Sequence, residues 1–336
     1  MTIKSQLNRV FVFVAAVVVY AAFAVYLYFP HLNHFATYRG LLIPAAVVAA
    51  AGTYLLSTRW INNPIASFFA GLLYAFGPFT LGFALYHPAA SLLVAVLPFT
   101  LLPAAFWPHK PFRFAPLVTA ALATFPFITI IAFFAIAAKF GLFPIPHTQK
   151  LCLVPYAGLL TPLVLKPLHF PYPGFYHVAV CPLIFGLFLF FRIHRIGAIL
   201  LCAIGIALAC YAAIGETSPI VWALLPILCF SIVAALGLEG LVIASGADKA
   251  SLANCAVCMA AIAATSAIVA FKAATGMDTL LFHAAAWYTA AAFAVYLILL
   301  LAVKEHRARA FRWAMLSLLM AADIFLAART IIDKLF

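Results

Sequence analysis

Residues 219–244 read PIVWALLPILCFSIVAALGLEGLVIA, and this run decides the fold class. Its only charged residue is Glu239, and it is long enough to cross hydrocarbon as a helix, which takes about 20 mostly apolar residues. Similar runs fill the chain on both sides of it. Because a backbone in lipid must satisfy its own hydrogen bonds, repeated runs of this length predict an all-α bundle of transmembrane helices.

The composition supports a membrane protein and excludes other classes. Of 336 residues, 68% are hydrophobic and 8% are charged, whereas soluble domains average roughly 45–50% apolar and 25% charged residues. This chain has too little polar surface for a soluble enzyme, a nucleic-acid-binding domain or a disordered chain. The net charge of +12 comes from few charged residues, and it suits cytoplasmic loops and lipid headgroups rather than nucleic acid.

We predict about eleven spans, which form a single integral membrane domain over residues 1–336. The spans are 9–29, 41–57, 64–85, 89–107, 114–138, 176–191, 196–214, 219–244, 251–271, 281–303 and 313–331. Pro78, Pro88 and Pro98 interrupt or border two of them. Membrane helices tolerate such prolines when neighbouring groups satisfy the freed carbonyls.

Lys and Arg residues predict the orientation, since they concentrate in cytoplasmic loops. With the N-terminus in the cytoplasm, twelve basic residues lie inside and seven outside. The loops 191–195 and 304–309 are especially basic. The predicted topology therefore has a cytoplasmic N-terminus.

The long connection at residues 139–175 falls outside and holds seven of the 21 prolines. A regular transmembrane helix is not expected across so many prolines, and long ordered loops often serve as lids or binding loops. Two interpretations stay open. The loop either binds a ligand at the outer leaflet or only caps the bundle.

Basic residues and histidines gather on the predicted external side. A cationic group there can bind a phosphate or an anionic lipid headgroup, while the alternative is a set of interfacial histidines beside aromatic residues. The candidate lipid- or phosphate-binding residues are Arg39, His87, Lys139, His147, Lys150, Lys166 and His169. Their spacing indicates no metal site, and we expect no cofactor.

Two acids fall inside predicted spans, Glu239 and Asp323. Intramembrane acids are expensive and often functional, so a transport or proton-relay role is one interpretation for Asp323, and hydrogen bonding between helices is the other. Glu239 is expected to cap a helix or to pair with Lys249 or a nearby basic loop. Cys255 and Cys258 form a CxxC without a second ligand pair, which favours helix packing over metal binding.

Residues 59–79, RWINNPIASFFAGLLYAFGPF, followed by His87 and by Leu97-Pro98-Phe99, resemble a pattern of the GT-C superfamily of membrane glycosyltransferases. The run 215–241 is similar to late helices of YfhO-like bacterial membrane proteins. Tyr172-Pro-Gly-Phe-Tyr176 looks like their re-entry from the periplasmic loop.

The resemblance implies a GT-C-like fold that presents an external cavity to a polyprenyl-phosphate-linked sugar, in a bacterial inner membrane. In such enzymes the first external loop carries a catalytic Asp or Glu. Here that loop, residues 29–40, contains no acid. His31 or His34 is the remaining candidate base, because the pKa of His suits neutral operation. An active enzyme and a reduced, non-catalytic relative therefore both stay open.

Three functions follow, in order of preference. The first is a GT-C-like protein that handles a polyprenyl-phosphate-linked sugar or lipid at the external face. The second is a non-enzymatic structural or assembly subunit of a membrane complex. The third is a transporter. The expected partners are membrane lipids, polyprenyl phosphate among them, and other subunits of a membrane complex, without nucleic acid.

Overall fold

In the computed structural model, the described part of the chain is helical, with one isolated β-bridge between Ile214 and Thr217. The described residues are 3–34, 37–107, 115–142, 180–192, 196–211, 214–215, 217–243, 249–272, 286, 289–290, 294 and 309–335. The predicted span 281–303 and the loop 139–175 lie almost entirely outside them. The predicted all-α class is confirmed.

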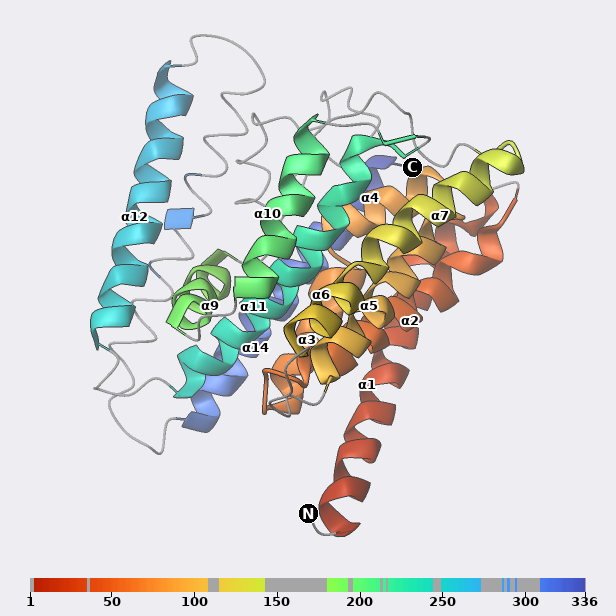
Figure 1. Ribbon diagram of the computed structural model, residues 1–336. Helices are drawn as coiled ribbons and strands as arrows, with labels where there is room; N and C mark the ends of the chain where they lie inside the picture. Colours follow the sequence, from red (N-terminus) through yellow and green to blue (C-terminus); the bar gives the residue numbers. More distant parts are fainter. Residues whose placement is uncertain are drawn as a thin grey trace.

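The helices follow the predicted spans closely (Figure 1). They are α1 (Ile3–Tyr28), α2 (Leu42–Ser57), α3 (Pro64–Ala75), α4 (Pro78–Tyr86), α5 (Ala90–Phe106), α6 (Ala115–Ala123), α7 (Phe125–Lys139), α9 (Val180–Arg192), α10 (Ile196–Tyr211), α11 (Leu224–Ile243), α12 (Lys249–Lys272) and α14 (Arg309–Leu335). Short 3₁₀ helices are η1 (Phe29–His34), η2 (Arg39–Leu41) and η3 (Pro219–Ala223). The predicted spans 64–85 and 114–138 are each divided into two helices.

Five described helical segments are long and apolar enough to cross a membrane, or six if the bent pair α3–α4 counts as one span. These segments are those of a multi-pass membrane protein. The helices α5, α9 and α10 have 17, 13 and 16 residues, which is below the usual spanning length of about 20. The count of eleven spans therefore stays a prediction.

The helix α11 lies at the centre of the bundle, between α9 and α10 on one side and α3 on the other (Figure 1). With η3 it forms the most buried apolar segment: 89% of its most apolar window is buried, against 22% for α1. Trp222, Tyr20 and Tyr74 are among the largest fully buried side chains. The stretch that decides the fold class is therefore also the core of the bundle.

Glycines allow α9 and α11 to pack backbone against backbone. A Cβ at Gly186 would collide with the Val233 carbonyl, and a Cβ at Gly237 would collide with the Pro182 carbonyl. Small residues permit this close approach in membranes, where packing rather than hydrophobic burial drives helix association. The two glycines thus fix where α9 crosses α11.

Side-chain hydroxyls of Thr80 and Tyr74 compensate for two proline breaks. Pro78 and Pro98 lack the N–H that would bond the carbonyls of Tyr74 and Val94, four residues earlier. The Thr80 hydroxyl donates to the Tyr74 carbonyl, and the Tyr74 hydroxyl donates to the Val94 carbonyl at 3.2 Å. The carbonyl that Pro78 frees at the 41° bend between α3 and α4 and the carbonyl that Pro98 frees in α5 therefore both accept hydrogen bonds inside the bundle, as predicted for intramembrane prolines.

Candidate functional site

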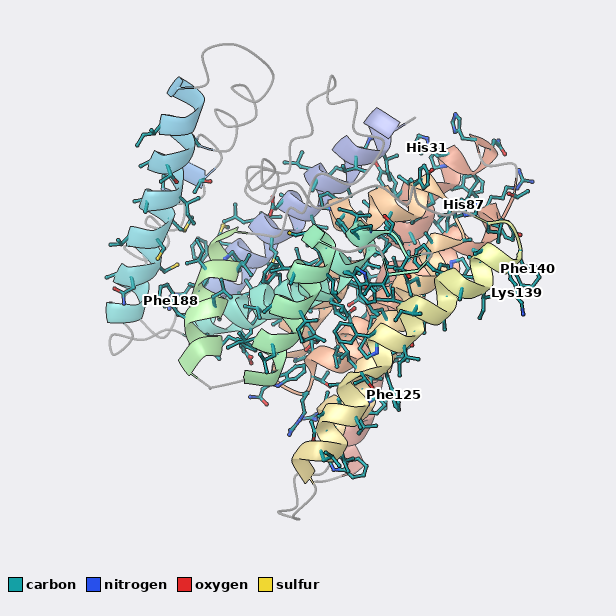
Figure 2. The ribbon with its side chains drawn as sticks, turned by 45° about the horizontal axis from the view of Figure 1, so that its top comes forward. His31, His87, Phe125, Lys139, Phe140 and Phe188 are labelled. Atoms are coloured by element: carbon teal, nitrogen blue, oxygen red, sulfur yellow. The ribbon has the colours of Figure 1, made fainter. Side chains whose placement is uncertain are left out.

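The candidate site lies at one end of the bundle, where α1, α4 and α7 finish. Figure 2 places His31, His87, Lys139 and Phe140 together at this end, with Phe125 at the other end of α7. We call it the His87 end. It is the end that the predicted topology places outside. The alternating direction of the helices brings these side chains together although they are far apart in the sequence.

The loop after α1 folds into two short 3₁₀ helices. The His34 Nδ1 lies 3.3 Å from the His31 carbonyl, and the two imidazole rings are 5.8 Å apart. Tyr38 adopts the left-handed conformation, with a φ of 58°, and its carbonyl accepts the Leu41 N–H at 2.9 Å. This reversal leads directly into the exposed Arg39.

His87 follows the last residue of α4 and is half-buried. Its Nδ1 accepts the Ala89 N–H at 3.2 Å, so the neutral ring carries its proton on Nε2. Burial lowers the pKa of His87 below its ordinary value of 6.5. At neutral pH the ring is therefore an uncharged hydrogen-bond donor through Nε2.

The first loop and His87 meet through aromatic rings. The Tyr38 ring centroid lies 6.0 Å from that of His87, at an interplanar angle of 46°. Tyr38 was not among the predicted site residues. An interfacial tyrosine directly before Arg39 was the only sequence signal that could have indicated its position.

Two of the three described candidates are exposed cations, Arg39 and Lys139, and the third is the neutral donor His87. The described residues of the loop after α1, of the α4–α5 connection and of the end of α7, which are 29–34, 37–41, 86–89 and 139–142, include no Asp or Glu. The other candidates, His147, Lys150, Lys166 and His169, lie outside the described residues. An end with these groups can bind an anion by charge and by hydrogen bonds.

Glu239 occupies a different place, at the far end of the α3–α4 pair. Its carboxylate accepts the backbone N–H of Asn63 at 2.9 Å and that of Asn62 at 3.4 Å. A carboxylate is stabilised where a helix begins, because the first N–H groups are unpaired there. Glu239 thus anchors the start of α3 through Asn63, which lies 176 positions away in the sequence.

The start of α3 is itself specified locally. Asn63 caps the helix by accepting the Ile65 N–H at 2.8 Å, and Pro64 takes the first helical position. Asn at the cap followed by Pro is a recognised N-terminal signature. These residues belong to the motif that resembles the GT-C pattern, and here they begin a helix.

Arg59 completes the anchoring of the α2–α3 connection. Its Nε donates to the Ala105 carbonyl at 2.9 Å, near the end of α5, where carbonyls lack helical partners. The motif residues Arg59 and Asn63 therefore hold helices in place at the end opposite to His87.

Asp323 is buried within α14, with 8% of its surface exposed.

Comparisons of the chain with family models, with curated proteins and with solved structures found no match. The likeness to the GT-C superfamily therefore rests on the quoted residues and stays a hypothesis.

Proposed function

We propose that this integral membrane protein binds the phosphate group of a lipid of the polyprenyl-phosphate class at the His87 end, and handles lipid-linked sugars or lipids there. The observation that carries the proposal is the gathering of the exposed Lys139 and the neutral donor His87 at one end of an apolar bundle. The exposed Arg39 belongs to the same end, because it follows Tyr38, whose ring lies 6.0 Å from that of His87. A phosphate at headgroup depth is the anion that such an end meets in a bilayer.

The polar groups at the His87 end contribute to phosphate binding in different ways. The guanidinium of Arg39 presents a planar fork that can bond two phosphate oxygens, whereas Lys139 contributes a point charge. His87 offers Nε2–H without a charge of its own, since Nδ1 already accepts the Ala89 N–H. Tyr38 and Phe140 supply aromatic surface at the same end, and aromatic rings suit the interface between lipid and water.

The proposal favours binding over transfer of a sugar. An acceptor hydroxyl needs a base to remove its proton, and the first loop provides no carboxylate. The same observation supports the second candidate, a non-enzymatic subunit of a membrane complex. Copurification in a stoichiometric complex that carries no bound polyprenyl lipid would favour that candidate.

The test uses the full chain in lipid nanodiscs and native mass spectrometry. The probes are undecaprenyl phosphate and undecaprenol, which share the lipid tail and differ in the phosphate. Tighter binding of the phosphate form by tenfold or more is expected, because charge-assisted hydrogen bonds contribute about 1.5–3 kcal/mol each and 1.4 kcal/mol is a factor of ten. Equal binding of both probes would contradict a phosphate site.

A further inference from the structure

Among the described residues, Tyr38 is the only non-glycine residue with a left-handed backbone, with a φ of 58° and a ψ of 7°. This conformation is strained for a bulky L-residue, because its Cβ crowds the neighbouring carbonyl oxygen. Glycine adopts the conformation freely, yet Gly40 in the same loop has no positive φ. The strain therefore falls on a tyrosine, although a glycine lies two positions away.

Strain of this kind persists only where the surroundings hold it, and it often marks a functional position. Burial does not hold Tyr38, because its side chain is 46% exposed. Its carbonyl accepts the Leu41 N–H at 2.9 Å, which closes the turn. Its ring centroid lies 6.0 Å from that of His87, with 46° between the ring planes. The left-handed turn thus places the phenol ring beside the imidazole.

The imidazole of His87 is also held from a second element. Its Nδ1 accepts the Ala89 N–H at 3.2 Å within the α4–α5 connection, whereas Tyr38 belongs to the loop after α1. With Nδ1 engaged, Nε2–H is the remaining hydrogen-bonding group of the neutral ring. Arg39 directly follows Tyr38 and is exposed. The contact of Tyr38 with His87 therefore also fixes where the side chain of Arg39 begins.

We propose that Tyr38 is the positioning residue of the His87 end, whose ring orients the imidazole so that Nε2–H and the guanidinium of Arg39 bond the same phosphate. This role rests on the proposed phosphate site. A tyrosine that only anchored the protein at the lipid–water interface would need no strained backbone. Tyr26, in the regular helix α1, is 50% exposed without such strain.

The contact is tested without polyprenyl lipid, by NMR of the full chain with ¹³C-labelled histidine in nanodiscs, where a His87→Asn spectrum assigns the His87 signal. Tyr38→Phe keeps the ring and should leave the chemical shift and the pKa of His87 unchanged. Tyr38→Asn removes the ring but suits a left-handed backbone, so the loop keeps its turn. Its His87 signal should move, and the pKa of His87 should rise toward the ordinary value, because the ring no longer shields the imidazole from water. An unmoved signal and titration in Tyr38→Asn would overturn the proposal.

The affinity of the same variants for undecaprenyl phosphate tests the presentation of the donors. Tyr38→Phe should bind as the native protein does, and Tyr38→Asn about 3- to 10-fold more weakly, which corresponds to one hydrogen bond. The matched control is Tyr26→Ala, which removes another exposed tyrosine and should change neither the His87 signal nor the affinity. Native affinity in Tyr38→Asn, or an equal loss in Tyr26→Ala, would overturn the role. If the native protein does not prefer undecaprenyl phosphate to undecaprenol, the phosphate site itself fails, and the NMR result alone decides whether Tyr38 positions His87.

Discussion

The Glu239 carboxylate accepts the backbone N–H of Asn63 at 2.9 Å and so joins α11 to the N-cap residue of α3. This bond holds the central helix against the bent α3–α4 pair, whose other end leads to His87. The position of His87 therefore depends on an anchor at the opposite end of the same pair.

Replacement of Glu239 by Ala is expected to destabilise the fold by about 2–4 kcal/mol, because two backbone donors lose their partner inside the protein. Glu239→Gln keeps a carbonyl oxygen and should retain most of the stability. The measurement is the thermal melting temperature of the purified protein in detergent. A Glu239→Ala variant with the melting temperature of the native protein would show that the carboxylate is dispensable for stability.

The hydroxyl of Tyr74 is expected to contribute about 1 kcal/mol through the Val94 carbonyl that Pro98 leaves free. Tyr74→Phe should therefore lower stability by that amount. In a Pro98→Ala background the helix supplies its own N–H to Val94, so the same substitution should cost little. A double-mutant cycle measures the coupling, and a cycle that closes with zero coupling would disprove the compensation.

Gly237→Val should destabilise the bundle by about 3 kcal/mol, because its side chain meets the Pro182 backbone and cannot be accommodated by rotamer changes. Gly197→Ala on α10 is the control, since a Cβ there meets nothing within 4 Å. That variant should be neutral or slightly stabilising. Chemical denaturation in mixed micelles compares the two, and similar losses in both would argue against a tight crossing at Gly237.

The stability of the protein should fall as the pH drops below about 6.5. Burial lowers the pKa of folded His87 below 6.5, so the unfolded chain binds a proton first. Neutral His87 thus contributes its full stability above pH 6.5, and that contribution is lost as the pH falls through the lowered pKa. His87→Asn, whose amide oxygen can still accept a backbone N–H, should weaken this pH dependence in melting experiments. An unchanged profile would exclude His87 as its source.

Hydropathy predicted most of the fold because each helix in lipid must contain its own apolar run. Ten of the eleven predicted spans contain a described helix, and the breaks at Gly77 and Thr124 fall one and two residues before Pro78 and Pro126, respectively. The way these helices pack could not be predicted. The crossing at Gly186 and Gly237 depends on the packing surfaces of both α9 and α11. In the sequence, neither glycine alone indicates that the two helices meet there.

The candidate site was predictable only in part. The alternation of spans predicts that His31, His87 and Lys139 share one side, and the structure places them at one end. The pairing of Tyr38 with His87, and the contact of Glu239 with Asn63, join residues far apart in the chain. Neither pairing has a local sequence pattern, since both arise from the way the helices assemble.

The most direct test of the proposed phosphate site measures the affinity of undecaprenyl phosphate for the full chain in nanodiscs. The comparison covers the native protein, the Arg39→Ala/Lys139→Ala double variant and the Arg9→Ala control, which removes an exposed cation from the opposite end of α1. The double variant is expected to bind about 10- to 100-fold more weakly, while the control is expected to bind as the native protein does. Native affinity in the double variant, or an equal loss in the control, would contradict a phosphate site at the His87 end.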